Sequence, residues 1–262
     1  VLKAAFKNTR ILDGRAFIGI GLLGLAMSFS SNPDVYDAFI LVVSLILYVA
    51  YAFAINNCFD ADTDSLNPAK WDKNPVASGE LSFRAGVISS TLIILVGIFL
   101  ASTLGRGEFW IYVTMVALAT VYSAPPRLKA RPIIDVLSHG IFFGVLPFLY
   151  GAYFDGILTR GEITIAVAVL LYSFALELRN HLEDYESDLR AGLKTTPIVL
   201  GREASETLVV VFSALSLVLL LASFNFALGA LGVAVYGFKD NYRLMDAGVV
   251  ALLITHLLGT VV

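Results

Sequence analysis

The stretch that decides the fold is Asn56-Asn57-Cys58-Phe59-Asp60-Ala61-Asp62-Thr63-Asp64, which follows a long apolar run. Read as a helix, it places Asn56, Asp60 and Asp64 on one face, because positions i, i+4 and i+8 lie above one another. We call these three residues the first acidic motif. The pattern predicts a polar stripe at the mouth of a hydrophobic segment.

The same pattern occurs once more, far along the chain. Asn180, Asp184 and Asp188 have the same spacing and also follow an apolar run. We call these three residues the second acidic motif. We expect the two motifs to face each other and to hold divalent metal.

The composition is typical of an integral membrane protein. Of the 262 residues, 58% are hydrophobic and only 15% are charged, whereas about a quarter of the residues in soluble domains are charged. The net charge of −3 does not point to a nucleic-acid partner, and the single cysteine, Cys58, excludes an internal disulfide. Residues 1–15 are basic and have no cleavage-site pattern, so we interpret them as a cytoplasmic lead-in rather than a signal peptide.

Long apolar segments predict an all-α, polytopic bundle of nine transmembrane helices, since a helix needs about 20 mostly apolar residues to span a bilayer. Pro147 lies inside the fifth segment and is expected to kink it. The turn between the seventh and eighth segments is marked only by Asn225. The nine segments are approximately 16–30, 35–56, 83–104, 109–123, 133–154, 163–182, 204–224, 226–238 and 245–262.

The basic residues give the orientation of this bundle. Of the 18 Lys and Arg residues, all but Arg106 and Arg160 fall on one side if nine segments alternate. The positive-inside rule makes that side cytoplasmic, so both acidic motifs lie at the cytoplasmic ends of their helices. We treat residues 1–262 as one domain, with parallel pseudo-repeat halves of about 1–130 and 131–262.

Acidic side chains at a helix C-terminus oppose the macrodipole and repel each other at i, i+4, so simple capping is a poor explanation for the two motifs. Hard divalent cations take oxygen ligands, and Mg²⁺ often shares carboxylates with substrate phosphates. Four carboxylates balance the charge of two Mg²⁺ ions, and two amides add neutral oxygens. The predicted ligands are Asn56, Asp60, Asp64, Asn180, Asp184 and Asp188.

A diphosphate bound to these ions needs further positive charge, which the neighbouring loops supply. A metal–diphosphate site at the end of an apolar bundle suits an isoprenyl diphosphate, such as geranyl or geranylgeranyl diphosphate. Arg15 and His139 are polar residues in or near apolar segments. The candidate cations are Lys70, Lys73, Arg127, Lys129, Arg190 and Lys194.

Two other functions remain open at this point. A cation transporter can also carry paired acids, although transporter sites usually lie at the midplane on broken helices. A CDP-alcohol phosphotransferase also uses helical aspartates with Mg²⁺, but the compact Asp-x2-Asp-Gly-x2-Ala-Arg pattern is missing from the sequence. Dependence of binding on a prenyl tail would separate these classes.

Over essentially its full length the chain resembles the UbiA superfamily of intramembrane prenyltransferases. The first motif continues with Lys70, Lys73-Asn74-Pro75 and Ser78-Gly79, similar to the family's basic residue, Arg-Pro and Ser-Gly, with lysine in place of arginine and Asn74 inserted before the proline. The second motif continues with Gly192, Lys194, Thr195 and Pro197, and the stretch from Tyr122 to Lys129 resembles the family's loop after the fourth helix.

The resemblance implies an enzyme that transfers a prenyl group. It implies that Asp60, Asp64, Asp184 and Asp188 are catalytic through Mg²⁺, and that the basic residues bind diphosphate with Tyr122 as a hydrogen-bond donor. It also implies a lipophilic acceptor, either an archaeal-type glycerol phosphate ether lipid or an aromatic quinone precursor, and Arg15 and His139 are our candidates for contact with it. The expected location is the cell membrane, with the active site facing the cytoplasm.

Overall fold

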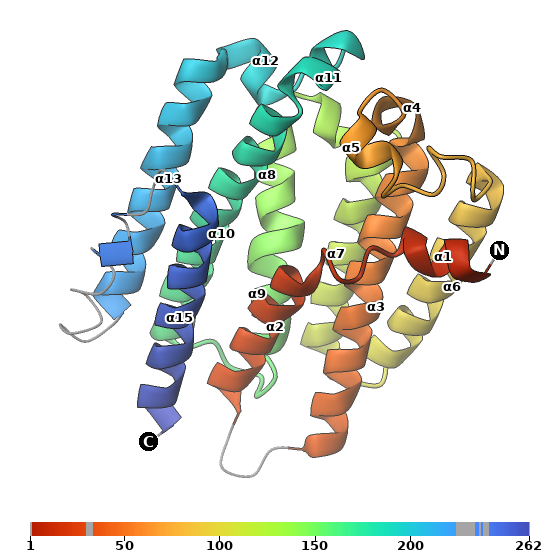
Figure 1. Ribbon diagram of the computed structural model, residues 1–262. Coiled ribbons are helices and arrows are strands. Elements are labelled where there is room, and N and C mark those ends of the chain that lie inside the picture. Colours follow the sequence, from red (N-terminus) through yellow and green to blue (C-terminus); the bar gives the residue numbers. More distant parts are fainter. Residues whose placement is uncertain (1, 30–33, 224–233, 236, 238–240, 262) are drawn as a thin grey trace.

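The computed structural model describes residues 2–29, 34–223, 234–235, 237 and 241–261, and these parts of the chain are helical with no strand among them (Figure 1). The predicted eighth segment falls largely outside the described residues. In chain order the elements are α1 (Leu2–Asn8), α2 (Arg15–Ser28), α3 (Val35–Phe59), α4 (Ala61–Asp64), α5 (Pro68–Trp71), α6 (Phe83–Ala101), α7 (Arg106–Ser123), η1 (Leu128–Ala130), α8 (Ile134–His139), η2 (Gly140–Val145), α9 (Leu146–Ala152), α10 (Arg160–Glu183), α11 (Tyr185–Arg190), α12 (Thr196–Leu200), α13 (Arg202–Ser223) and α15 (Tyr242–Val261).

Several long helices begin where the sequence supplies a side-chain cap. Asp34 Oδ1 accepts from the backbone N of Tyr36 at 2.9 Å at the start of α3. Thr159 and Glu162 form a reciprocal capping box at the start of α10. Such caps satisfy backbone N–H groups that have no partner within the helix. The apolar runs therefore start as helices at defined residues.

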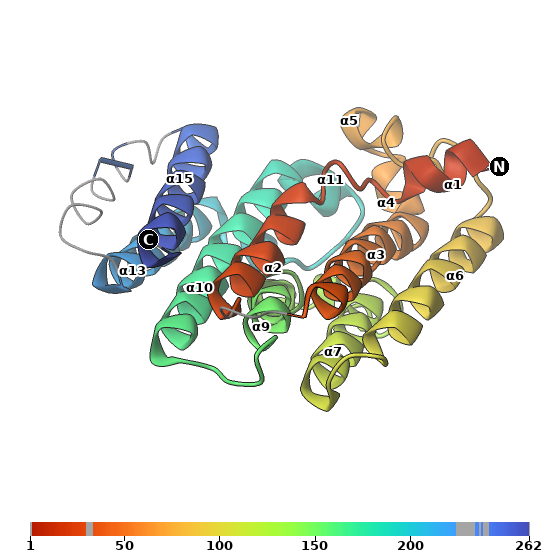
Figure 2. The ribbon, with the colours of Figure 1, turned by 90° about the horizontal axis from the view of Figure 1, so that it is seen from below.

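The helix α3 packs against α6, α7 and α2, with α6 and α7 at one side of the bundle (Figure 2). Leu41, Leu45, Tyr48 and Val49 on α3 are fully buried. Two thirds of the apolar window of α3 (67%) is inside the protein, against 22% for α6. The remaining face of α6 is apolar and exposed, as expected for a helix that meets lipid.

The prediction of nine spanning helices is not confirmed. In the described residues, five segments are long and apolar enough to cross a membrane: α3, α6, the α8–η2–α9 segment, α10 and the first part of α13. The helix α2 has 14 residues, which at 1.5 Å per residue is about 21 Å, short of a hydrocarbon core of about 30 Å. The apolar stretch of α15 is also shorter.

The fifth predicted segment is continuous but not a regular α-helix. Residues Gly140–Val145 form a π-helical segment, and Pro147 follows it inside the first turn of α9. Proline removes a backbone donor, and π-helical turns often accompany functional sites. The segment lies beside α10 and α7. It presents Phe142 and Phe143 to the interior of the bundle.

The short helices gather at one end of the bundle. Figure 1 shows α4, α5, α11 and α12 at the top, beyond the ends of α3 and α10. The two acidic motifs belong to this end. The fold thus places the motifs where the long helices stop.

Candidate functional site

The two acidic motifs have the same backbone geometry. The helix α3 ends at Phe59, and Asp60 bends the chain with φ −101° and ψ 0° before α4. The helix α10 ends at Glu183, and Asp184 bends it with φ −89° and ψ 0° before α11. The sequence suggested one straight helix through each motif. The structure instead has a long helix, a bend and a short second helix at each motif.

The bends keep the spacing of the motifs. The backbone N of Asp60 donates to Asn56 O at 2.9 Å, and that of Asp64 to Asp60 O at 2.8 Å. The corresponding bonds in the second motif are 3.0 Å and 2.8 Å. Because each i to i−4 bond is retained, the three side chains of each motif stay on one side of the chain.

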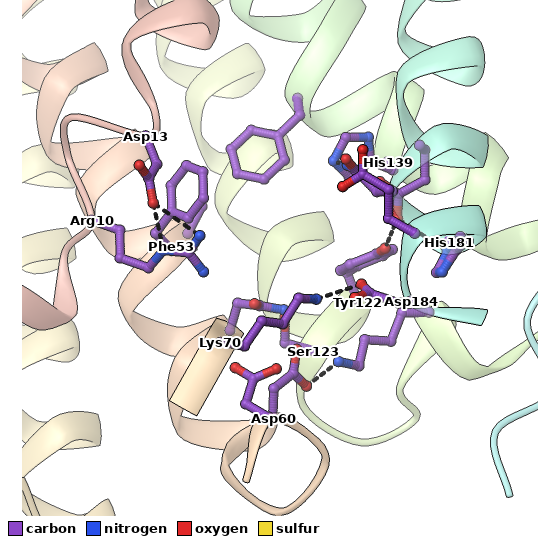
Figure 3. A pocket seen from close by; sticks show the side chains of 18 of the residues that line it. Arg10, Asp13, Phe53, Asp60, Lys70, Tyr122, Ser123, His139, His181 and Asp184 are labelled. Atoms are coloured by element: carbon purple, nitrogen blue, oxygen red, sulfur yellow. Dashed lines mark hydrogen bonds and ion pairs between the residues drawn. The ribbon is translucent and has the colours of Figure 1, made fainter. Parts of the chain in front are cut away.

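Both motifs line a single cavity of about 690 Å³ (Figure 3). All six predicted ligands belong to its wall. Its deeper part is apolar and aromatic, with Phe17, Phe53, Phe142 and Phe143 among the lining residues. The cavity therefore has a charged mouth and a hydrophobic interior.

Ion pairs cross between the motifs. Lys70, which follows the first motif, pairs with Asp184 of the second. Lys129, from η1, pairs with Asp60, and Arg127 Nη2 lies 3.4 Å from the same carboxylate. The Lys129 and Asp60 side chains are only 10% and 9% exposed. The site thus balances its acids with cations from two separate loops.

Asn74 holds Asp64 in place. Its Nδ2 donates to Asp64 Oδ2 at 2.8 Å and to Asn57 O at 2.8 Å, and its Oδ1 accepts from Val76 N at 2.9 Å. Asn74 is fully buried. The asparagine that departs from the family pattern is therefore an anchor for the acidic motif.

The cavity shifts the pKa of two charged groups. Burial, followed by the negative charge of Asp60, raises the pKa of Asp64. Burial favours the neutral form of Lys70, but the carboxylates of Asp184, Asp64 and Asp60 together outweigh burial and raise the pKa of the amine. Lys70 therefore stays protonated, while Asp64 takes up a proton more readily than an ordinary aspartate.

The other predicted residues divide into two groups. Lys73, Tyr122 and His139 line the cavity, as Lys70 and Lys129 do. Arg127 reaches Asp60 without lining it. Lys194 is exposed and outside the lining, and Arg15 is exposed, with Nη1 donating to Leu12 O at 2.6 Å.

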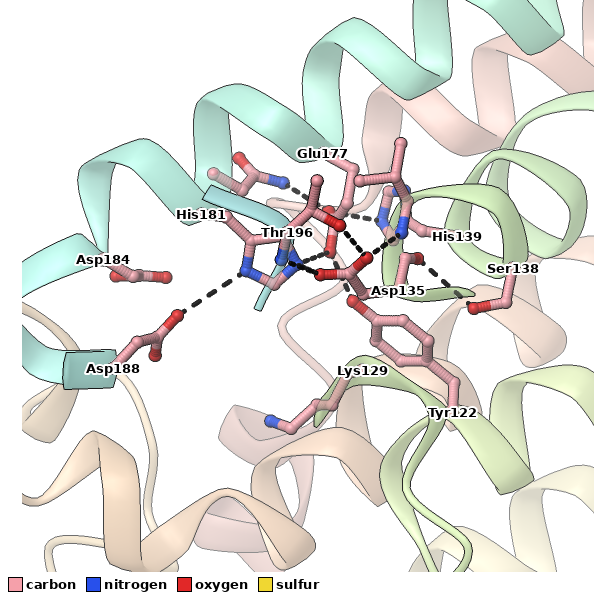
Figure 4. A network of polar contacts seen from close by, with 12 residues as sticks. Tyr122, Lys129, Asp135, Ser138, His139, Glu177, His181, Asp184, Asp188 and Thr196 are labelled. Carbon is pink, nitrogen blue, oxygen red and sulfur yellow. Dashed lines mark hydrogen bonds and ion pairs between the residues drawn. The ribbon is translucent and has the colours of Figure 1, made fainter. Parts of the chain in front are cut away.

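A buried polar network in the wall of the cavity was missed by sequence reasoning (Figure 4). Glu177 is 4% exposed. It accepts from the Tyr122 hydroxyl and from Asn180 Nδ2, the latter at 3.1 Å. His139 Nε2 and His181 Nε2 lie 3.2 and 3.1 Å from its two oxygens. A signal was present, since Glu177 precedes Asn180 by one helical turn and shares its face.

Arg10 and Asp13 are charged lining residues that the sequence analysis did not identify either. Arg10 pairs with Asp13 at 2.9 Å, and its guanidinium lies 5.4 Å from the centre of the Phe53 ring. Its backbone has φ 43°, a left-handed conformation that is uncommon outside glycine. Nothing in a single sequence marks such a residue.

The side chains that line the cavity fit a Mg²⁺ ion that is coordinated jointly by protein carboxylates and substrate phosphate. No three His, Cys, Asp or Glu side chains among the described residues are grouped closely enough to hold a metal ion by themselves. Mg²⁺ does not require such a cage, because it usually takes one or two carboxylates and completes its octahedron with water and phosphate oxygens. The lining is oxygen-rich and acidic, as that mode of binding needs.

Comparison with known proteins gives a consistent result. The model of the UbiA prenyltransferase family matches residues 17–248. Digeranylgeranylglyceryl phosphate synthase of Thermococcus gammatolerans is 29% identical over 217 residues, which is 83% of this chain and 75% of the relative. Lycopene elongase/hydratase of Halobacterium salinarum is 31% identical over 199 residues, covering 73% of this chain and 67% of the relative.

Solved structures share the fold. A UbiA homolog from Archaeoglobus fulgidus bound to GPP and Mg²⁺ superposes with a TM-score of 0.80 at 21% identity, covering 98% of both chains. A structure concerned with digeranylgeranylglyceryl phosphate synthase gives a TM-score of 0.75 at 17% identity, covering 98% of both chains.

Proposed function

Because this chain belongs to the UbiA prenyltransferase family, we propose that it transfers an isoprenyl group from an isoprenyl diphosphate to a lipophilic acceptor, with Mg²⁺ as cofactor. The reaction breaks the bond between C1 of the prenyl group and the diphosphate oxygen, joins C1 to the acceptor in place of an acceptor hydrogen, and releases diphosphate and a proton. The observation that carries the proposal is one cavity lined by both acidic motifs, with lysines at its mouth and aromatic rings beneath.

The acidic motifs are the proposed metal site. Asp60, Asp64, Asp184 and Asp188 would hold two Mg²⁺ ions, with Asn56 and Asn180 as neutral oxygen ligands, because four carboxylates balance the charge of two ions. Mg²⁺, when bound, neutralises the diphosphate and stabilises it as a leaving group. Support comes from the cavity lining and from the oxygen character of all six side chains.

Residues at the mouth of the cavity bind the diphosphate. Lys70, Lys73 and Lys129 neutralise its remaining negative charge. The Tyr122 hydroxyl belongs to the same wall but donates to Glu177, so it can donate to the diphosphate only after that bond breaks. Arg127 acts through Asp60, which it contacts. Lys194 lies outside the lining, so we leave it out of the diphosphate site.

The aromatic interior protects the prenyl group. Breaking the C1–O bond leaves positive charge on an allylic carbon, which water would capture. Phe53, Phe142 and Phe143 exclude water, and the faces of aromatic rings attract positive charge.

The acceptor is a glycerol phosphate ether lipid of archaeal type or, alternatively, an aromatic quinone precursor. The names of the relatives favour an isoprenoid lipid. His139 lines the cavity and keeps its role as an acceptor contact, whereas Arg15 does not reach it. The excess of Lys and Arg at the site end supports a cytoplasmic orientation within the cell membrane.

A parallel pseudo-repeat, with halves of about 1–130 and 131–262, would explain the matching bends at Asp60 and Asp184. The transporter and CDP-alcohol phosphotransferase alternatives are not favoured, because neither accounts for membership in a prenyltransferase family.

Binding of geranyl diphosphate to the detergent-solubilised chain tests the proposal directly. We expect saturable binding that requires Mg²⁺ and is lost in Asp64→Ala. Asp62→Ala is the matched control, because Asp62 belongs to the same stretch but is exposed and outside the cavity lining. Binding that is indifferent to Mg²⁺ and to Asp64 would contradict the metal assignment.

A further inference from the structure

The depth of the cavity is the same on its two principal helices. The deepest lining residue of α3 is Ala52, eight positions before Asp60, and that of α10 is Leu176, eight positions before Asp184. At 1.5 Å per residue, both walls end about 12 Å below the acidic motifs. The deepest lining residues contributed by α2, α7 and η2 are Ile20, Ala119 and Phe143.

Three tyrosines fill the bundle beyond that depth. Tyr48, Tyr112 and Tyr150, which we call the tyrosine plug, are fully buried and are not part of the cavity lining. The Tyr48 and Tyr112 rings lie 6.1 Å apart, and the Tyr112 and Tyr150 rings 5.4 Å apart. The plug therefore occupies the continuation of the cavity between α3, α7 and α9.

Hydrogen bonds fix the plug in position. The Tyr48 hydroxyl donates to Phe142 O at 2.6 Å, and the Tyr112 hydroxyl to Ser44 O at 2.9 Å. The Tyr150 hydroxyl lies 2.7 Å from Ser44 Oγ. Displacing one of these rings leaves a buried polar group without a partner, so the plug does not give way easily to an apolar tail.

Phe143 separates the cavity from the plug. Its ring stacks on Phe17 at 4.3 Å and meets Tyr48 edge-on at 6.3 Å. Phe143 lines the cavity, whereas Tyr48 does not. Phe143 is thus the floor of the cavity, supported from below by Tyr48.

This depth can be compared with the length of a prenyl tail. An extended five-carbon unit is about 5 Å long, since its four carbon–carbon bonds of about 1.5 Å advance along a zigzag. A ten-carbon tail of about 10 Å fits above Phe143. A twenty-carbon tail of about 20 Å reaches well past it.

We propose that Phe143, supported by the tyrosine plug, sets the donor chain length, so that the chain prefers a ten-carbon prenyl diphosphate to a twenty-carbon one. The proposal rests on the proposed function and specifies its donor. A ten-carbon donor differs from the geranylgeranyl group that the names of the digeranylgeranylglyceryl phosphate synthases contain.

The test is a series of donors with 5, 10, 15 and 20 carbons, namely dimethylallyl, geranyl, farnesyl and geranylgeranyl diphosphate. Binding to the full chain in detergent is measured with Mg²⁺. We expect geranyl diphosphate to bind more tightly than geranylgeranyl diphosphate by about ten- to a hundredfold, the range that overfilling a packed core costs. Equal or tighter binding of the twenty-carbon donor overturns the proposal but leaves prenyl transfer intact. Failure of all four donors to bind contradicts the proposed function itself.

Variants of the floor identify the responsible residues. Phe143→Ala should move the preference toward longer donors, and Ala119→Leu should move it toward the five-carbon donor. Phe212→Ala is the control for loss of a phenylalanine ring, because Phe212 packs away from the cavity.

The two cavity variants act in opposite directions, so the proposal stays testable if one of them fails to fold. Folding is checked by size-exclusion chromatography and thermal unfolding. An unchanged preference in a folded Phe143→Ala or Ala119→Leu variant shows that the floor does not set the chain length.

Discussion

Replacing Lys129 by glutamine removes the closest cation from the Asp60 carboxylate. Both side chains are about nine tenths buried. Loss of one partner from a fully buried pair costs about 3–5 kcal/mol, because the remaining charge is left without compensation. Here Asp60 keeps Arg127 at 3.4 Å, so we expect a smaller loss of unfolding free energy, about 1–3 kcal/mol in the absence of Mg²⁺.

Mg²⁺ should reverse part of this loss. If Asp60 is a metal ligand, the bound ion supplies the positive charge that Lys129 provided. Ligands that bind only the folded state raise its stability, so Mg²⁺ should raise the unfolding midpoint of Lys129→Gln more than that of the wild type. The variant should still bind donor diphosphate more weakly, because Lys129 also contributes charge to the leaving group.

The assay is thermal unfolding in detergent, with and without Mg²⁺. Asp60→Asn combined with Lys129→Gln completes a double-mutant cycle, which isolates the energy of the pair. Lys194→Gln is the control, since Lys194 is exposed and outside the cavity, and its effect should stay within about 0.5 kcal/mol. Unchanged stability of Lys129→Gln without Mg²⁺ would refute the buried-pair reasoning.

Other predictions follow from the same contacts. Lys70→Met should weaken diphosphate binding and remove the ion pair of Lys70 with Asp184. Its effect on stability should be smaller than that of Lys129→Gln, because the Lys70 side chain is 36% exposed. An equal loss of stability in thermal unfolding would contradict this. Because the pKa of Asp64 is raised, its ionised form weakens the folded state at neutral pH, and this penalty disappears as the pH falls through that pKa. Mg²⁺ affinity, which needs the ionised form, should therefore decline on acidification at a higher pH than an ordinary aspartate pKa of about 3.9 predicts. Titration calorimetry from neutral pH down to the ordinary aspartate range checks this, and a decline that begins only at the ordinary aspartate pKa would contradict it. Glu177→Gln should lower the free energy of unfolding by about 1–3 kcal/mol, since the donors around this buried carboxylate, including Tyr122, lose a charged acceptor. Unchanged thermal unfolding would show that this polar network does not stabilise the fold.

Much of the site could be predicted because it depends on local spacing. The interval of four residues in Asn56, Asp60 and Asp64 keeps them on one side of the chain, and that interval survives the bend at Asp60 because the backbone bonds continue through it. The apolar runs and the family resemblance led to a membrane prenyltransferase, which the family match confirms. The roles of individual residues stay predictions.

Hydropathy led to a prediction of nine spanning helices, which the described residues do not confirm, since five of their segments are long and apolar enough to span. The helix α2 is too short to cross unaided, and it is held against α9 by close contact of Gly24 and Gly151 with the facing backbone. Hydropathy does not report where a helix ends, because capping and packing with other segments decide that. Hydropathy likewise does not predict the π-helical turn before Pro147.

The sequence by itself therefore determined the membrane class, the two acidic motifs and their common spacing, because these depend on residues close together in the chain. The pairing of Lys70 with Asp184, the placement of Glu177 against Tyr122 and His139, and the tyrosine plug under Phe143 were decided only by the tertiary structure. These contacts join residues that are far apart in sequence, and their energies depend on which side chains burial brings together.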